Sequence, residues 1–455
     1  MSAPTSSRPA LPARPSYAAV LRVPHARRTF AAALTARLSY GTVSLSVMLA
    51  VTRATGSYAV SGAVMSLFGA TSVFLMPLRA SLVDRYGRRR ALLPMAVLYG
   101  ALLCALAVLT WGPGAPAAAV AAAAALAGAC APPLGPTMRA VWSELVADRG
   151  LLLRAYSLDG VAEELLFVSG PILVGVLVGF APPASGILLS ALLVVAGTCA
   201  FVTSPVMTGS RPAPRRERSR GRLAGLRGLL PPVAVAAGVG LALSGVDLLV
   251  MAFAAGRSYD TAVVPWVLGA LSAGSAVGGL VNGAIDWRTP ARVRLTWFAA
   301  GLGPVIAAAG LAPGLWTLAA VMACAGAFIA PALTTAYLLA DETAAEGSRT
   351  RAGAWVNAAV NAGGSGGALV TGLLIGALPV GVCFLLAGGT SVAAALVAGP
   401  WRRRQGCSVR PAPGPRSRAD VATGLRDVPA APADAGRSAS GPCPVPSGSR
   451  GRAGR

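Results

Sequence analysis

Long apolar runs, bounded by arginine, proline or glycine, dominate the chain between residues 29 and 400. A run of about 20 residues is long enough for an α-helix to cross the hydrocarbon layer of a bilayer. Two sets of such runs lie on either side of a polar stretch: 29–51, 58–78, 91–111, 117–138, 157–180 and 185–207, then 229–253, 261–283, 293–312, 315–338, 353–376 and 380–400. The pattern predicts an all-α integral membrane protein with twelve transmembrane helices in two six-helix bundles.

The two ends and the middle of the chain have a different composition. Residues 1–28 and 401–455 are rich in Pro, Ser and Arg and lack apolar periodicity, which is typical of disordered tails. Residues 208–228 are interpreted as a charged linker between bundles at 29–207 and 229–400. The first apolar run is too long for the core of a cleaved signal peptide, so we expect it to stay as a membrane anchor.

Composition and charge agree with a membrane protein. Of 455 residues, 55% are hydrophobic and 12% charged, whereas soluble domains carry about 25% charged residues. The net charge of +23 comes from arginines in the gaps between apolar runs, so we expect a lipid bilayer and not a nucleic acid as the partner. Successive gaps between the runs lie on alternate sides of the membrane, and the gaps on one of these sides contain only two arginines, Arg53 and Arg257. The other, arginine-rich side and both termini are therefore predicted to be cytoplasmic, in the plasma membrane.

Several chemistries are disfavoured by residues that the chain lacks. It has seven cysteines without a C-x-x-C pair and a single histidine, His25, which precedes the first run. No metal ion and no cofactor are expected, and a membrane-embedded enzyme is only a remote alternative. A phosphate-binding loop for an ATP-driven pump requires a lysine, and the sequence contains none.

The densest cluster of charge connects the second and third runs. Residues 84–90 read Asp-Arg-Tyr-Gly-Arg-Arg-Arg. Gly87 permits a tight turn, and Asp84 can pair with nearby arginines or face the positive N-terminus of a helix. This motif resembles the loop between helices 2 and 3 of the major facilitator superfamily (MFS), and the chain is similar to drug-exporter-like actinobacterial permeases of that family. The glycine usual four residues before the acid is Ala80 here.

The resemblance implies a monomer that works by alternating access, in which Asp84 latches the two halves against the start of the eleventh span. Arg85, Arg88 and Arg89 are then its salt-bridge and surface partners. The alternative is that the loop only enforces topology. A faint repeat, in which Asp84 corresponds to Asp286 about 200 residues later, supports the two-half architecture.

Ionisable residues inside the apolar runs are candidates for transport or proton coupling, because burying them in a membrane is costly. Arg37 in the first run and Glu163 and Glu164 in the fifth lie at matching depths, and Asp159 shares a helix face with Glu163. The first and fifth spans are neighbours in the facilitator fold that this chain resembles, so the resemblance and the matching depths together imply a pair between Arg37 and one of the two glutamates. The glutamate is either a proton carrier or part of a fixed structural pair.

Further polar residues in the second half leave two interpretations open. Asp247 either binds a cation or a substrate amine, or lies at the membrane boundary and pairs with Arg257. Asn357 and Asn361 either line a cavity or form hydrogen bonds between helices.

Glycine and proline indicate where helices approach one another or bend. In the fifth run, Gly170, Pro171 and Gly175 interrupt regular backbone bonding and partly resemble the Gly-Pro motif of drug–proton antiporters. Gly363 and Gly367 suit a close crossing with the second run. The prolines at 132, 133 and 136 are expected to bend the fourth run.

These observations and the resemblance predict a multi-pass secondary transporter working by alternating access, with proton-coupled efflux (antiport) of small organic molecules as the leading interpretation. The alternative is an importer or a metabolite, sugar or amino-acid permease of the same fold. No enzymatic activity is expected.

Overall fold

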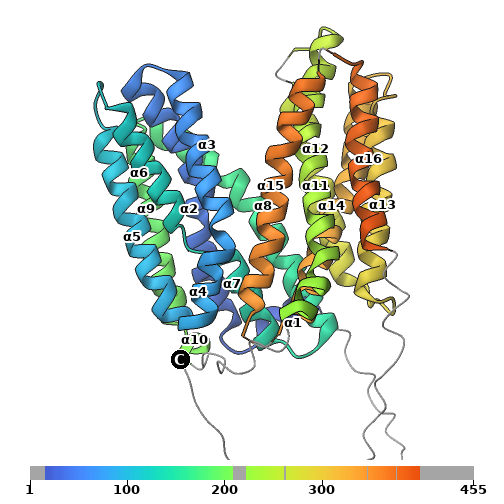
Figure 1. The fold of residues 1–455 in the computed structure, drawn as a ribbon, viewed down its shortest axis with the longest axis horizontal. Helices are drawn as coiled ribbons and strands as arrows, with labels where there is room; N and C mark the ends of the chain where they lie inside the picture. Colours follow the sequence, from blue (N-terminus) through green and yellow to red (C-terminus); the bar gives the residue numbers. More distant parts are fainter. Residues whose placement is uncertain (1–15, 209–221, 261–262, 346, 376, 400–455) are drawn as a thin grey trace, which may run out of the picture. The chain divides into compact units, whose positions relative to one another are not determined.

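The structure is a computed structural model that describes residues 16–208, 222–260, 263–345, 347–375 and 377–399. Within these residues the chain is almost entirely α-helical (Figure 1). The helices are α1 (Tyr17–Arg22), α2 (Ala26–Thr55), α3 (Tyr58–Phe74), α4 (Met76–Tyr86), α5 (Arg88–Leu109), α6 (Ala117–Cys130), α7 (Leu134–Leu145), α8 (Arg149–Val178), α9 (Ala184–Val202), α10 (Pro205–Thr208), α11 (Arg222–Gly256), α12 (Val264–Ala284), α13 (Ala291–Ala309), α14 (Leu315–Thr343), α15 (Arg349–Leu374) and α16 (Val380–Ala398).

The predicted all-α membrane fold is confirmed. In the described part, nine helical segments are long and apolar enough to cross a membrane, and the bent pair α3–α4 makes a tenth. The predicted spans at 293–312 and 353–376 correspond to α13 and α15, whose arginine, glycine and asparagine residues lower their hydropathy. Both helices nevertheless pack inside the second bundle, α13 against α14 and α16, and α15 against α11. Twelve spanning elements result within the described ranges.

Small residues hold the helices of each bundle close together. In the first bundle α2 packs against α9 and α8, and α3 against α6. A Cβ placed at Gly197 of α9 would lie 2.3 Å from the backbone nitrogen of Ala36 in α2, so only glycine fits there. Gly170 likewise faces the backbone of Gly41. Backbones that approach this closely gain dispersion contacts that lipid cannot replace.

Proline has different effects in different spans. The fourth span is broken between α6 and α7 at Pro132 and Pro133, as predicted. The second span is also broken, with α3 and α4 meeting at 42°, which the sequence analysis did not predict. By contrast, α8 continues through Gly170 and Pro171 without a break. Pro171 has no N–H to donate, so regular backbone bonding is interrupted there without ending the helix, and the expected close helix approach is present at Gly170.

Two further segments differ from the expectations. Residues 16–28, within the predicted disordered tail, form α1 and the start of α2. The Tyr17 hydroxyl donates to the carbonyl of Leu280, and burial raises the pKa of Tyr17. Helix α11 begins at Arg222, inside the predicted linker. Residues 1–15, 209–221 and 401–455, to which the tails and most of the linker were assigned, lie outside the described residues.

Candidate functional site

A cavity of about 450 Å³ is bordered by both bundles. Its walls come from α2, α3, α4, α7 and α8 of the first bundle and α11, α14 and α15 of the second. Pockets of roughly 300–1,000 Å³ hold drug-sized molecules. Because residues of both bundles line it, a molecule bound there contacts both.

Four charged side chains form a closed cluster at the wall of this cavity. Arg37 of α2 lies 2.7 Å from Asp159 and 3.0 Å from Glu163, both of α8. Arg139 of α7 lies 3.1 Å from Asp159 and also pairs with Glu163. Each arginine thus contacts both carboxylates, and the cluster is neutral when all four groups are ionised.

Burial explains why these groups occur together. Arg37 and Asp159 are 2% and 0% exposed, so neither charge is tolerable without its partner. The predicted pairing of Arg37 with Glu163 is present, and the pairing with Glu164 is not. The guanidinium of Arg139 also lies over the ring of Tyr337, 3.7 Å from its centroid. Tyr337 belongs to α14, so the second bundle contacts the cluster through an aromatic face.

Glu164 has different surroundings from Glu163, its neighbour in the chain. One carboxylate oxygen accepts a hydrogen bond of 2.5 Å from the hydroxyl of Ser275 in α12 of the second bundle. The other, Oε2, is buried without a hydrogen-bond partner. Among the described residues no arginine lies within ion-pair distance of Glu164. Within the described part of the chain, Glu164 therefore joins the two bundles through a carboxylate without a counter-ion.

The structure does not pair Asp247 with Arg257, so the predicted pairing is wrong, and the position of Asp247 at the membrane boundary stays a prediction. The guanidinium of Arg257 donates to the carbonyl of Pro313 and lies 4.4 Å from the ring centroid of Phe253. Asp247 is exposed and lies on α11 four residues beyond Leu243, which lines the cavity. Residues four apart share a helix face. Asp247 thus lies on the face that continues from the cavity.

The two asparagines of α15 line the cavity. The side-chain amide of Asn361 donates to the side-chain oxygen of Asn357 at 2.7 Å, within the same helix. Gly363 and Gly367 face Ala237 and the rest of α11, so they do not form the expected crossing with the second span. Asn357 and Asn361 therefore place polar side chains at the wall of the cavity.

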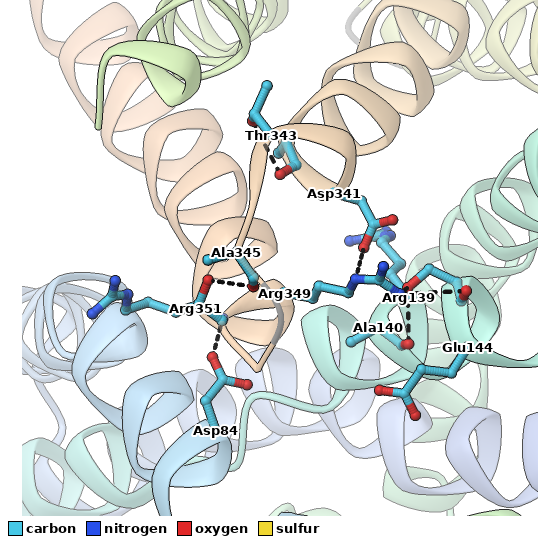
Figure 2. A network of polar contacts seen from close by, with 12 residues as sticks. Asp84, Arg139, Ala140, Glu144, Asp341, Thr343, Ala345, Arg349 and Arg351 are labelled. Atoms are coloured by element: carbon cyan, nitrogen blue, oxygen red, sulfur yellow. Dashed lines mark hydrogen bonds and ion pairs between the residues drawn. The ribbon is translucent and has the colours of Figure 1, made fainter. Parts of the chain in front are cut away.

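The charged loop after the second span contacts the second bundle (Figure 2). Asp84 accepts a hydrogen bond of 2.9 Å from the backbone N–H of Arg351, in the first turn of α15. N–H groups of the first turn lack partners within their helix, and a carboxylate there also interacts with the helix dipole. Arg88 pairs with Glu144 of its own bundle, and Arg85 lies over the ring of Tyr86. One of the two positions that the sequence analysis considered for Asp84 was opposite the N-terminus of a helix, and Asp84 lies opposite the N-terminus of α15.

The repeat-related acid also contacts the other bundle, through an arginine side chain and not a backbone N–H. Asp286, after α12, accepts a hydrogen bond of 2.8 Å from Arg154 near the start of α8. The hydroxyl of Ser143 in α7 accepts one of 3.1 Å from Arg349 at the start of α15. We call the side of the bundles that carries Asp84, Ser143 and Asp286 the arginine-rich end. Polar contacts join the two bundles there.

Sequence reasoning missed several residues of the site. Arg139 directly follows the predicted fourth run at 117–138 and was therefore placed in a gap between runs, yet α7 continues through Trp142 to Leu145. The apolar residues after Arg139 were the available signal. Ser275 and Tyr337 carry no local signal, since their positions depend on packing between distant segments.

Comparisons with known proteins agree with this architecture. Among curated proteins no relative of the sequence is detected. The human organic anion transporter MFSD10 (TETRAN) shares 15% identity and a TM-score of 0.62, covering 82% of this chain and 99% of that one. A bacterial homologue of the iron transporter ferroportin in an outward-facing state shares 16% identity with a TM-score of 0.63, covering 82% of this chain and 96% of that one. The fucose:proton symporter FucP of E. coli shares 14% identity with a TM-score of 0.62, covering 84% of this chain and 98% of that one.

Likeness at these identities shows the fold alone. The family model of the Major Facilitator Superfamily, however, matches residues 29–312, more than half of the sequence. That match covers the loop motif at Asp84 and the charge cluster around Arg37. The chain is a multi-pass membrane transporter and not an enzyme, and it belongs to the Major Facilitator Superfamily.

Proposed function

We propose that this chain exports small organic molecules in exchange for protons, by alternating access to the cavity between its bundles. The observation that carries the proposal is the contrast between two adjacent glutamates. Glu163 is held by two arginines, whereas Glu164 has a free carboxylate oxygen and a single bond to the other bundle. A carboxylate without a counter-ion in a low-dielectric site is the group at which binding a proton removes an uncompensated charge.

Glu164 then serves as the proton carrier, and Glu163 as part of a fixed structural cluster. Protonation changes the strength of the bond to Ser275, which connects α8 with α12. Hydrogen bonds to ionised groups are stronger than those to neutral groups. Proton uptake at Glu164 therefore weakens a contact between the bundles, as coupling of protonation to alternating access requires.

We assign the arginine-rich end to the cytoplasmic side of the plasma membrane. The distribution of arginines between the spans supports this orientation. The bonds of Asp84, Asp286 and Ser143 then close the cytoplasmic end, which corresponds to an outward-facing state. The ferroportin homologue of similar fold was itself solved in an outward-facing state.

Export and coupling are tested together in inverted membrane vesicles from a host that lacks its own exporters. A panel of toxic organic compounds is first screened for resistance with and without a proton uncoupler. For a compound that responds, uptake into vesicles is driven by a pH gradient, and substrate exchange is measured without one. We expect Glu164→Gln to abolish gradient-driven uptake while retaining substrate exchange, since the bond to Ser275 and the cavity persist.

Two variants serve as comparisons. Glu163→Gln removes a partner of both arginines, so both uptake and exchange fall. Glu144→Gln changes a half-exposed glutamate at the arginine-rich end and leaves both rates unchanged. Full gradient-driven uptake by Glu164→Gln would refute the role of Glu164, and insensitivity to the uncoupler would refute proton coupling. Transport only in the opposite orientation would establish import.

A further inference from the structure

Two spans of the first bundle are broken beside each other. The second span breaks between α3 and α4, where Pro77 follows the bend, and the fourth between α6 and α7 at Pro132 and Pro133. A Cβ at Gly128, near the end of α6, would lie 2.4 Å from the carbonyl oxygen of Phe68 in α3. The same Cβ would lie 2.3 Å from the hydroxyl oxygen of Thr71, so the last turns of α3 and α6 are in contact.

Each break leaves carbonyl groups without their usual helical donors. In a helix the carbonyl of Gly128 would bond to the N–H of residue 132, but Pro132 has none. The carbonyl of Ser72 would bond to the N–H of Met76, and the bend between α3 and α4 separates these residues into two helices. The carbonyl of Gly128 keeps only a long bond of 3.4 Å from the N–H of Ala131. Buried carbonyls without a well-placed donor are destabilising, so a further donor stabilises each break.

Arg79 of α4 supplies a donor to both breaks. Its Nη1 donates to the carbonyl of Gly128 at 2.7 Å, and its Nη2 donates to the carbonyl of Ser72. The side chain is 3% exposed, and among the described residues it has no carboxylate within ion-pair distance. Its charge faces the C-terminal ends of two helices, where the helix dipole favours a cation. Tyr40 adds a hydrogen bond to the carbonyl of Pro132.

The segments beyond the two breaks contact the second bundle. Both α4 and α7 pack against α15 at the arginine-rich end. Asp84 of α4 bonds to Arg351, and Ser143 of α7 bonds to Arg349. Movement of α4 and α7 relative to α3 and α6 would therefore separate the first bundle from α15.

We propose that Arg79 is the positioning residue of a hinge: it fixes α4 and α7 to the ends of α3 and α6, and the arginine-rich end opens by bending at these two breaks. The proposal rests on alternating access but not on protons or on any substrate. In the closed state Arg79 satisfies the carbonyls of both breaks, so the two segments keep one common orientation. Without it each break bends independently and α15 is released more often.

Spin-label distances test the hinge directly in a cysteine-free background. One pair joins Leu67 of α3 to Ser81 of α4 across the bend, and a reference pair joins Val97 to Val108 on the unbroken α5. Leu67, Val97 and Val108 are exposed. We expect Arg79→Gln to broaden the distance distribution across the bend and to leave the α5 pair unchanged. Arg79→Lys, which keeps a cation and a donor, is expected to restore a narrow distribution.

Release of α15 is measured by labelling a cysteine with a membrane-impermeant maleimide. Gly353→Cys suits this purpose, because a Cβ there lies 3.5 Å from Pro136 of α7, an ordinary contact distance. In Arg79→Gln we expect labelling from the arginine-rich end to rise about tenfold, the shift produced by losing one hydrogen bond to a charged group. Arg28→Gln, at an exposed position in the first turn of α2, controls for loss of an arginine.

The outcomes separate the hinge from the proposed function. Unchanged distances and labelling in Arg79→Gln would overturn the hinge, and so would equal broadening of the α5 pair, which indicates general loosening. Neither readout requires transport. A failure of proton coupling in vesicles alongside the expected distances would therefore count against the proposed function alone.

Discussion

The charge cluster predicts a large and specific cost for Asp159→Asn. Asp159 is 0% exposed and contacts Arg37 at 2.7 Å and Arg139 at 3.1 Å. The substitution keeps the shape of the side chain and removes its charge, so Glu163 is left as the only carboxylate for two buried arginines. The cluster then carries a net positive charge in a site that water reaches poorly.

Removing one partner of a buried ion pair costs about 3–5 kcal/mol. Glu163 still contacts both arginines, so we expect a loss near the lower limit, about 3 kcal/mol, or about two orders of magnitude in the ratio of folded to unfolded protein. The free energy of unfolding is measured by titrating the detergent-solubilised protein with sodium dodecyl sulfate, followed by tryptophan fluorescence.

A double substitution separates charge imbalance from lost packing. Arg37→Leu together with Asp159→Leu removes one cation and one anion, and leaves Arg139 paired with Glu163. We expect this variant to be more stable than Asp159→Asn by at least about 1 kcal/mol, since neutral side chains can replace a buried pair at little cost. The surface variant Glu144→Gln should lose at most about 1 kcal/mol. If Asp159→Asn is as stable as Glu144→Gln, the reasoning from buried charge is refuted.

Substitutions at three further positions, Asp84, Tyr337 and Gly197, have defined expected outcomes. Asp84→Asn weakens the contact with the start of α15. We expect maleimide labelling in the Gly353→Cys background to rise about fivefold, the equivalent of about 1 kcal/mol. Equal labelling with and without the substitution would show that the bond to Arg351 does not hold the bundles together. Tyr337→Phe should keep the contact with Arg139 and transport normally, whereas Tyr337→Ala should lower transport; equal rates for both would rule out a role for the ring. Gly197→Val places a side chain against the backbone of Ala36 and should prevent stable assembly of the bundle, which is measured by monodispersity after size-exclusion chromatography. Gly62→Val, at an open position on α3, should leave the protein monodisperse.

The sequence predicted those parts of the structure that depend on local pattern and depth. Apolar runs located the spans, because length and the absence of charge decide whether a helix can cross a bilayer. Equal depth in the first and fifth spans, together with the resemblance to a fold in which these spans are neighbours, predicted a pair between Arg37 and Glu163, and the structure contains that pair. The acid at position 84 was placed opposite a helix N-terminus by its charge and by a motif, and it lies at the start of α15.

Other features were missed because they depend on contacts between distant segments. Arg139 was taken as a boundary, since an isolated arginine is costly in lipid; only the neighbouring Asp159 and Glu163 make its burial acceptable. The break in the second span was missed because Pro77 alone does not reveal that Arg79 satisfies the freed carbonyls. That information is carried by the fold of α6, about fifty residues further along the chain.

The cavity divides its chemistry unequally between the bundles. The charged side chains that line it, Arg37, Arg79, Arg139, Glu163 and Glu164, all belong to the first bundle. In the described residues the second bundle meets this set with neutral groups, the ring of Tyr337 over Arg139 and the hydroxyl of Ser275 on Glu164. A neutral partner can separate from a charged group without leaving a new buried charge on its own side, whereas separating an ion pair would leave two. At the cavity, charged groups confined to the first bundle and neutral contacts from the second therefore let the bundles part without separating an ion pair, whereas the pair of Arg154 with Asp286 at the arginine-rich end must break.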